Sequence, residues 1–460
     1  MIAAATVQVL KVRKNTVPEQ ETYAAICRQT RGSKLPHKEK KMKGRTKKIE
    51  TSLLIATILI IFCAIAVYNS KLKADAAKLQ VNTVSFSGTD YEIGYQRAKF
   101  YSEELKKWKG AAKELFECPN GKALMSAYQC HESAMKSQSP NLLDEYRGMA
   151  AGAEMRLEDI IIANLGEETL YNTAGFPFNE KRISEPFFEM GCSAFAMTIS
   201  DRGPIIGNTH DASFPLKPGK CEYIENLKYN DGFQLIRSRG AGLNEMGLAV
   251  GTTNAHYLGK TKIGDGKSEY LSIALLRYCP DVNSAVDYIR NYRTTDDGTH
   301  FVLADISGKA AAVEKGPNDI FHVQWADSKG NLKVAWITNA PVPGSLAGDR
   351  WNFKNYGDCY TNNPKKRYAR LKNIFTDPNF KYTYESAEAV LLHHDPCSGI
   401  CQHGDIYPSQ AYTTRTRMML PAEGTLLLAA RVDPNQEEWR PCKVGWTAKK
   451  TIKITRHQQK

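Results

Sequence analysis

The chain has few cysteines, no internal repeat and no Asn-x-Ser/Thr acceptor for N-linked glycosylation. Eleven cysteines among 460 residues are too sparse for a small disulfide-stabilised scaffold. No segment recurs at the period of about 20–50 residues that solenoids and propellers need. The hydrophobic fraction of 42% and the charged fraction of 24% exclude collagen-like, coiled-coil and wholly disordered chains. The length fits one large α/β domain with a tail, or two to three average domains.

Acidic residues are scarce only at the N-terminus. Residues 1–50 carry 13 Lys and Arg against 4 Asp and Glu, a balance of +9, whereas the other 410 residues are nearly neutral. A nucleic-acid-binding domain needs its basic residues on one face of a folded unit. Because the excess lies in a polar tail, we exclude nucleic acid as a partner and expect residues 1–50 to be a basic, flexible segment.

Charge is missing altogether from residues 51–70, TSLLIATILIIFCAIAVYNS. Twenty helical residues at about 1.5 Å each span about 30 Å, the hydrocarbon thickness of a bilayer. The basic segment KEKKMKGRTKK (38–48) precedes the run, which places the N-terminus in the cytosol and the bulk of the chain outside or in a lumen. We therefore predict a single-pass signal anchor. The lack of a glycosylation acceptor is unusual for a luminal domain of this size.

Beyond the apolar run, the sequence changes character at Gly191. Residues 80–191 show helical spacing of apolar residues, as in 89–117 and 141–171. Residues 192–450 contain short β-prone runs separated by Gly, Asn and Asp. Four further segments in this part have helical patterns: 268–279, 284–293, 365–375 and 386–394. The pattern predicts an α+β fold, with a helical N-terminal part and a layered C-terminal part. Residues 214–232 and 340–362 are expected to be loops.

Several familiar motifs are incomplete. KIGDGKS (262–268) lacks the first Gly of a phosphate-binding loop, because Thr261 stands there. Ser193 has no Gly-x-Ser-x-Gly turn around it. HHDPCSGICQH (393–403) is rich in His and Cys, but its C-x3-C-x-H spacing is not a common zinc site. We expect no metal or other cofactor. The sequence leaves two disulfide possibilities undecided: one that links Cys397, Cys401 or Cys442 to another cysteine, and one between Cys118 and Cys130.

Five polar residues occupy positions at the ends of predicted strands or at a helix start. Cys192 begins a strand after Gly191, and Asp211 ends the next strand. A hairpin brings these two ends together. Asn254 and Asn339 each follow an apolar strand, and Arg367 lies at the start of a helix. Taken singly, each has a structural explanation: a small buried thiol, a turn cap, loop amides and a solvated helix charge.

Together these segments resemble the N-terminal nucleophile (Ntn) hydrolases with an N-terminal Cys. The sequence is most similar to the peptidase C45 family, which includes penicillin acyltransferase and carcinine hydrolase. It is more distantly similar to bile-salt hydrolases and acid-ceramidase-type amidases. The resemblance covers about residues 85–445. It rests on the order of GCSAFAM, GNTHDASF, NEMGLAVGTTN, FVLADISGKAAAVE, ITNAPVPG, KKRYARL and the ICQHGD segment with the Thr and Met that follow it, up to 418.

The resemblance implies a four-layer αββα sandwich and self-cleavage between Gly191 and Cys192. The two chains would stay associated, and the enzyme would cleave a linear N-acyl amide through a thioester. Acyl transfer to an amine and a catalytically silent tethered binding protein are the alternatives. The implied roles are Cys192 as nucleophile with its α-amine as base, Asp211 as the group that orients the amine, Asn254 and Asn339 as oxyanion donors, and Arg367 as the cation near the thiol.

One position departs from the pattern. Some relatives, bile-salt hydrolases among them, have an Arg three residues before the Asp, where this chain has Asn208. The resemblance therefore implies less positive charge near the thiol, unless His210 replaces part of it. Asn208 and His210 are expected to contact substrate.

Overall fold

The computed structural model describes residues 82–103, 105–106, 109, 121–164, 192–213, 222–255, 269–293, 298–316, 320–343, 345, 358–395, 399–402, 411–430 and 445–455. The chain divides into two compact units, Met1–Lys71 and Leu72–Lys460. The predicted basic tail and the predicted span at 51–70 belong to the first unit and lie outside the described residues. No helix within the ranges above combines the length and the apolar character that crossing a membrane requires.

The second unit contains two β-sheets. The eight-stranded sheet has the order β1 (Thr83–Gly88), β4 (Ile224–Tyr229), β5 (Gln234–Ser238), β6 (Ala241–Asn244), β7 (Leu248–Asn254), β8 (Thr299–Asp305), β9 (Lys309–Lys315) and β10 (Phe321–Asp327). The six-stranded sheet has the order β11 (Val334–Thr338), β2 (Cys192–Met197), β3 (Ile205–Ser213), β12 (Ala411–Leu420), β13 (Thr425–Ala430) and β14 (Ala448–Thr451). All pairings are antiparallel except that of β1 with β4.

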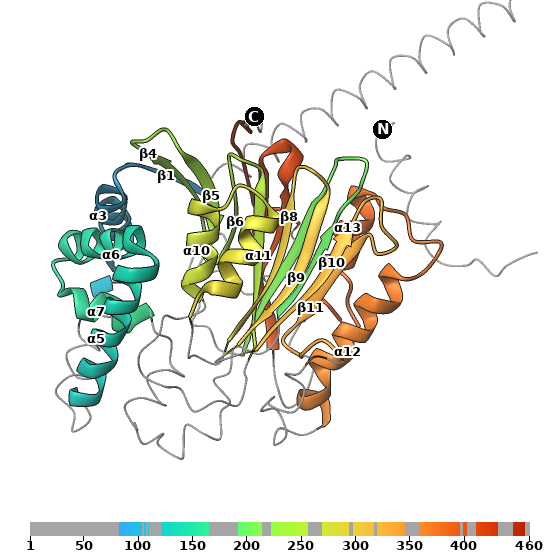
Figure 1. The fold of residues 1–460 in the computed structure, drawn as a ribbon, viewed down its shortest axis with the longest axis horizontal. Coiled ribbons are helices and arrows are strands. Elements are labelled where there is room, and N and C mark those ends of the chain that lie inside the picture. The colour runs from blue at the N-terminus through green and yellow to red at the C-terminus, as the bar shows by residue number, and fades with distance from the viewer. Residues whose placement is uncertain are drawn as a thin grey trace, which may run out of the picture. The chain divides into compact units, whose positions relative to one another are not determined.

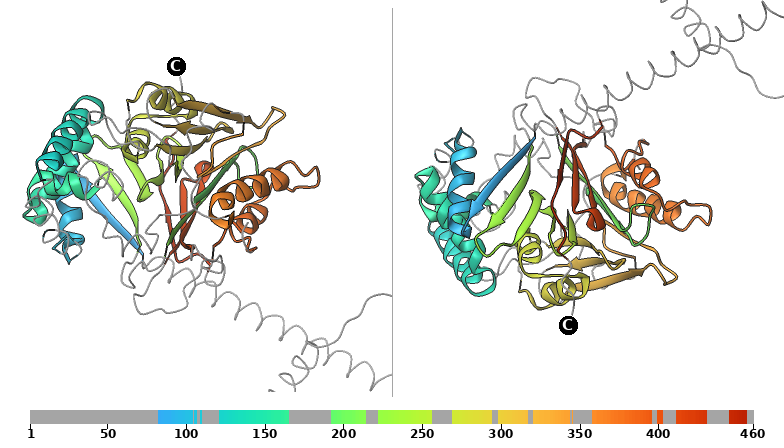
Figure 2. Two further views of the ribbon diagram at one scale, coloured as in Figure 1. Left: turned by 90° about the horizontal axis from the view of Figure 1, so that it is seen from below. Right: turned by 90° about the horizontal axis from the view of Figure 1, so that it is seen from above.

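Helices cover the outer face of each sheet. On the eight-stranded sheet lie α10 (Glu269–Tyr278) and α11 (Val282–Asn291), whose apolar side chains share a core with Leu248, Val250 and Phe301. On the six-stranded sheet lie α12 (Asp358–Phe375) and α13 (Tyr384–Leu391). The two inner faces meet in a second core that is rich in alanine, and small side chains let sheets pack closely. The predicted αββα layer order is therefore confirmed (Figures 1 and 2).

A third group of helices lies beside the β1 edge, away from α12 and α13 (Figure 1). It contains α3 (Asp90–Phe100), α5 (Gly121–Gln138), α6 (Pro140–Ala153) and α7 (Leu157–Asn164). Helix α3 begins with a capping box, in which Thr89 and Glu92 satisfy each other's backbone N–H groups. Gly94 and Gly148 let α3 and α6 approach so closely that a Cβ at either would lie 1.9 Å from a backbone oxygen.

The helical prediction for residues 80–191 is correct for these four helices and wrong at its start. Residues 83–88 form strand β1, which enters the eight-stranded sheet beside β4. The loop prediction for 214–232 is also wrong where β4 forms, at Ile224–Tyr229. Strand β1 pairs with β4 about 140 residues further along the chain, so no neighbouring segment of the sequence indicates it. Strand β4 also forms an antiparallel hairpin with β5, a local signal that the loop prediction missed.

Candidate active site

Cys192 is the first residue of β2 and is 1% exposed. The antiparallel register pairs it with His210 of β3, and its Sγ lies 3.6 Å from Nδ1 of that histidine. Side chains alternate along a strand. Cys192 and Ala194 therefore face the other sheet, whereas Ser193 and Phe195 face α12, where Phe195 packs on Phe375.

Asn339 joins Cys192 to the other sheet. It follows β11, which pairs with β2 and so carries Asn339 to the start of that strand. Its Oδ1 accepts a hydrogen bond of 2.5 Å from the backbone N–H of Cys192. Its Nδ2 donates to the backbone oxygen of Asn254 at the end of β7, at 2.9 Å. One amide side chain therefore spans the gap between the ends of β2 and β7.

Arg367 reaches the same point from the helix side. Its Nη1 donates to the Cys192 carbonyl oxygen at 2.5 Å and to Ser193 Oγ at 2.7 Å. Its Nη2 donates to Asn339 Oδ1 at 3.1 Å. Burial lowers the pKa of this fully buried guanidinium, whereas the nearby Asp211 and Cys192 act in the opposite direction. Arg367 thus contacts the backbone of Cys192.

Asp211 lies at the open end of the β2–β3 hairpin, the same end as Cys192, and is fully buried. Its Oδ1 accepts from Thr413 Oγ1 at 2.7 Å, and its Oδ2 has no hydrogen-bond partner. Burial raises the pKa of Asp211 to about 7, although Arg367 and Thr413 favour its ionised form. An incompletely solvated carboxyl of this kind is ready to bind a positive group or a proton.

His210 places its imidazole beside the thiol of Cys192. Burial lowers its pKa well below the ordinary value, and the positive charges of Arg415, Arg417 and Arg239 act in the same direction. The imidazole is therefore neutral at physiological pH. Protonation by the thiol would place another positive charge beside three guanidinium groups.

Asn208 lies between the two sheets, and its predicted contact with substrate stays a prediction. This residue is fully buried, and its Nδ2 donates to Ser193 O at 3.3 Å and to Thr252 O at 2.9 Å. Its Oδ1 accepts from Arg417 at 2.7 Å. Asn208 therefore links the two sheets, and its hydrogen-bonding atoms already have partners within the fold. His210 is only partly buried, so its predicted contact with substrate stays a prediction.

Other contributors escaped the sequence analysis. Asn363 positions Arg367 by accepting from its Nε at 2.7 Å. Thr413 binds Asp211, and Arg417 binds Asn208. The spacing of Asn363 one helical turn before Arg367 is a signal that could have been used. Thr413 and Arg417 lie about 200 residues after their partners, and only the β3–β12 register shows that they meet.

Some predictions fall on residues outside the described ranges. These are Gly191 at the expected cleavage site and Cys118, Cys397 and Cys442 of the open disulfide pairings. Within the part of the chain that is described, no group of three or more His, Cys, Asp or Glu residues is placed to hold a metal ion.

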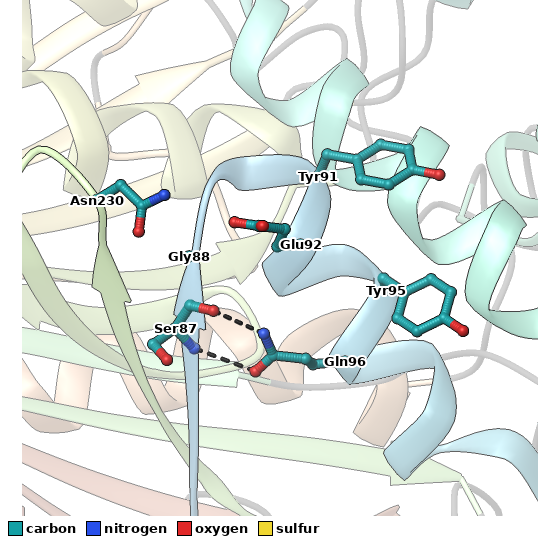
Figure 3. Close-up of a pocket in the computed structure, with 7 residues that line it drawn as sticks. All are labelled: Ser87, Gly88, Tyr91, Glu92, Tyr95, Gln96 and Asn230. Carbon is teal, nitrogen blue, oxygen red and sulfur yellow. Dashed lines mark hydrogen bonds between the residues drawn. The ribbon is translucent and has the colours of Figure 1, made fainter.

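A hollow on the surface lies away from Cys192, at the start of α3. It is lined by Ser87, Gly88, Tyr91, Glu92, Tyr95, Gln96 and Asn230 (Figure 3). Gln96 exchanges hydrogen bonds with the backbone of Ser87 there. None of the predicted catalytic residues lines this hollow.

Comparisons with known proteins give similarity among solved structures only. No family model and no curated protein matches the chain. Two mutant structures of conjugated bile acid hydrolase from Clostridium perfringens show 13% and 14% identity, cover 54% and 58% of this chain and 94% and 100% of their own, and give TM-scores of 0.34 and 0.35. Penicillin V acylase from Agrobacterium tumefaciens shows 14% identity over 53% of this chain and 84% of its own, with a TM-score of 0.34. Similarity at this level does not establish an activity for this chain.

Proposed function

We propose that this chain is a self-processing cysteine hydrolase of the Ntn class, of the peptidase C45 type, which cleaves a linear N-acyl amide. The observation that carries the proposal is the set of contacts around Cys192. Its thiol lies beside the neutral imidazole of His210. Its backbone N–H donates to Asn339, and its backbone carbonyl oxygen accepts from Arg367. A structural cysteine needs none of these contacts, whereas a residue that becomes both nucleophile and base needs all its atoms held.

In the proposed self-cleavage, the Cys192 sulfur attacks the carbonyl carbon of Gly191. A C–S bond forms, the Gly191–Cys192 C–N bond breaks, and the released nitrogen takes up a proton to become the α-amine. Water then hydrolyses the thioester, which leaves a carboxylate on Gly191 and regenerates the thiol. Residues 1–191 and 192–460 become separate chains.

The freed amine suits the role of general base. An α-amino group has a pKa of about 7.7–8.0 in model peptides, close to neutrality. Here its nitrogen lies 2.5 Å from Asn339 Oδ1, and Arg367 is bonded to the same oxygen. A buried guanidinium so close disfavours a second positive charge, which keeps the amine neutral and able to accept the thiol proton. Attack on the substrate carbonyl then gives an acyl-enzyme that water resolves.

We also propose that residues 51–70 anchor the protein in a membrane, with the N-terminus cytosolic and the hydrolase on the opposite side. The support is the uncharged run between Glu50 and Lys71 and the basic segment before it. The alternative activity within the same class is acyl transfer, in which an amine takes the place of water as the group that attacks the acyl-enzyme. A silent binding protein would have no need for the contacts around Cys192.

The test of self-processing compares wild type with Cys192→Ala on a reducing denaturing gel and by N-terminal sequencing. We expect the wild-type 51.4 kDa chain to split, with a new terminus at Cys192, and the variant to stay intact. Cys279→Ala is the matched control, because this cysteine is also buried but follows α10 in the core that this helix shares with the eight-stranded sheet. A wild-type chain that stays whole would leave the enzyme without its general base and would favour the silent binding protein.

A further inference from the structure

An arginine on β12 lies buried on the thiol side of the six-stranded sheet, and no carboxylate of the described residues is bonded to it. Arg417 is 2% exposed and stands opposite Asn208 in the β3–β12 register. Its Nη1 donates to Asn208 Oδ1 at 2.7 Å, and its Nε has no hydrogen-bond partner. Asn208 is neutral, so this hydrogen bond does not compensate the charge. Burying a guanidinium in this way is costly, and the cost calls for a reason.

Glu222, the described acid whose charge acts on Arg417, does not neutralise it. Its carboxylate is bonded to Arg415 at 2.5 Å and lies 3.1 Å from Arg239. One carboxylate therefore faces three guanidinium groups. Burial and the charge of Arg415 lower the pKa of Arg417 to about 9, which still leaves it charged at neutral pH.

Cys192 faces the same space as Arg417. Cys192 pairs with His210, and Ala194 pairs with Asn208, which in turn pairs with Arg417. Cross-strand partners share a face of a sheet, as do residues two apart. Cys192 and Arg417 therefore project from the same face, and the charges of the two groups act on each other. Arg367 approaches from the opposite face, so Cys192 lies between two buried guanidinium groups.

We propose that Arg417 is a positioning residue whose positive charge favours the thiolate form of Cys192. Its hydrogen bond to Asn208 holds the guanidinium group on the thiol side of the sheet. Arg417 supplies at this site the positive charge that the neutral Asn208 itself does not. In the processed enzyme the α-amine of Cys192 is neutral until it accepts the thiol proton, and in the unprocessed chain that proton goes to water. This inference rests on the proposed role of Cys192 as nucleophile.

Other ionisable groups lie around Cys192 on both faces of the sheet, and the test must separate their effects from that of Arg417. They are His210 and Asp211 on β3, Arg415 on β12, Arg367 on α12, and Glu222 and Arg239 beside β4 and β5. Asp211 opposes the thiolate when ionised, and His210 stays neutral. The guanidinium groups favour the thiolate. Arg415 is bonded to the carboxylate of Glu222, whereas Arg417 is bonded to the neutral amide of Asn208.

The test is the pH dependence of iodoacetamide alkylation of the full chain, read by mass spectrometry on the peptide that contains Cys192. We expect Arg417→Gln to move the midpoint up by about one pH unit. Below the midpoint, the variant then reacts about tenfold more slowly at a given pH. Arg417→Lys keeps the charge and should retain most of the wild-type reactivity. Asn208→Asp places a carboxylate against Arg417 and should raise the midpoint although the arginine is still present.

The control is Arg202→Gln, which removes an arginine paired with Glu423 at the other end of the β2–β3 hairpin. It should leave the midpoint unchanged. A wild-type midpoint in both Arg417→Gln and Asn208→Asp, or an equal shift in Arg202→Gln, would overturn the proposal. If Arg417→Gln shows no cooperative thermal unfolding, Asn208→Asp decides. Alkylation does not require cleavage at Gly191, so a chain that stays whole yet shows the shift would contradict the proposed function and not this inference.

Discussion

Cys192 gathers its partners from strand ends and one helix that are far apart in the sequence. Its predicted neighbours Asn339 and Arg367 bond directly to its backbone, and Asn254 lies one hydrogen bond further on. These residues could be predicted because the order of the segments that contain them resembles that of a known family. Arg417 could not, because it lies in the middle of β12, where a charge reads as a solvent-facing position. Only the register of three strands turns it towards the thiol.

Asp211 gives the residue scale its own prediction. Its pKa is raised from 3.8 to about 7 in the folded chain, so between these values the folded state binds a proton that the unfolded state has lost. The free energy of unfolding therefore falls as pH rises from about 4 to about 7. Asp211→Asn removes the ionisation and should raise the melting temperature relative to wild type at pH 8. The corresponding difference in the free energy of unfolding, on the order of a few kcal/mol at most, should shrink towards pH 4.

The measurement is thermal unfolding of both proteins across that pH range. Asp287→Asn on α11, whose carboxylate is exposed and pairs with Arg290, is the control and should follow the wild-type curve. Parallel curves for wild type and Asp211→Asn would show that burial does not impose this cost.

Among the elements, those with a clear local pattern were predicted and those defined by distant pairing were not. The segments 268–279, 284–293 and 386–394 correspond to α10, α11 and α13 within a few residues. Helix α12 begins at Asp358 rather than at 365, so Pro364 lies inside it; a proline favours predicting a helix start after it. Strand β1 has only six residues, of which Ser85 and Ser87 are exposed and Phe86 alone is buried, so its apolar pattern is weak without β4 beside it.

For the whole molecule, the proposed anchor makes a prediction about cell fractionation. The full chain should remain in the membrane fraction after alkaline carbonate extraction, whereas a chain lacking residues 1–71 should be released, because the only uncharged run of twenty residues is then gone. Protease added to intact vesicles should cut the basic segment 38–48 and leave residues 72–460 protected. Extraction of the full chain by carbonate would contradict the anchor, and digestion of residues 72–460 would contradict the orientation.

Self-cleavage at Gly191 would divide a cluster of buried charges between two chains. Arg97, Tyr101 and Glu145 would belong to the first, and Glu225 and Arg237 to the second. Glu225 accepts from Arg97 at 3.1 Å, from Tyr101 at 3.0 Å and from Arg237 at 2.9 Å, while Glu145 accepts from Arg237 at 2.7 Å. The charges of Arg97 and Arg237 outweigh burial and lower the pKa of Glu225 to about 2. Together with the β1–β4 pairing, this cluster should keep the cleaved chains associated.

Glu225→Gln tests that association, because it leaves two buried guanidinium groups to share Glu145. Removing one partner of a buried ion pair costs about 3–5 kcal/mol, so the two cleaved chains should separate at a lower urea concentration in size-exclusion chromatography. Glu103→Gln, which removes an exposed pair with Lys106, should separate as wild type does. In wild type, the stabilisation by Glu225 is fully present above about pH 4.5 and is lost as pH falls through about 2, so acid should also separate the chains. Separation of the wild-type chains in neutral buffer without urea would show that the cluster and the β1–β4 pairing do not hold them together.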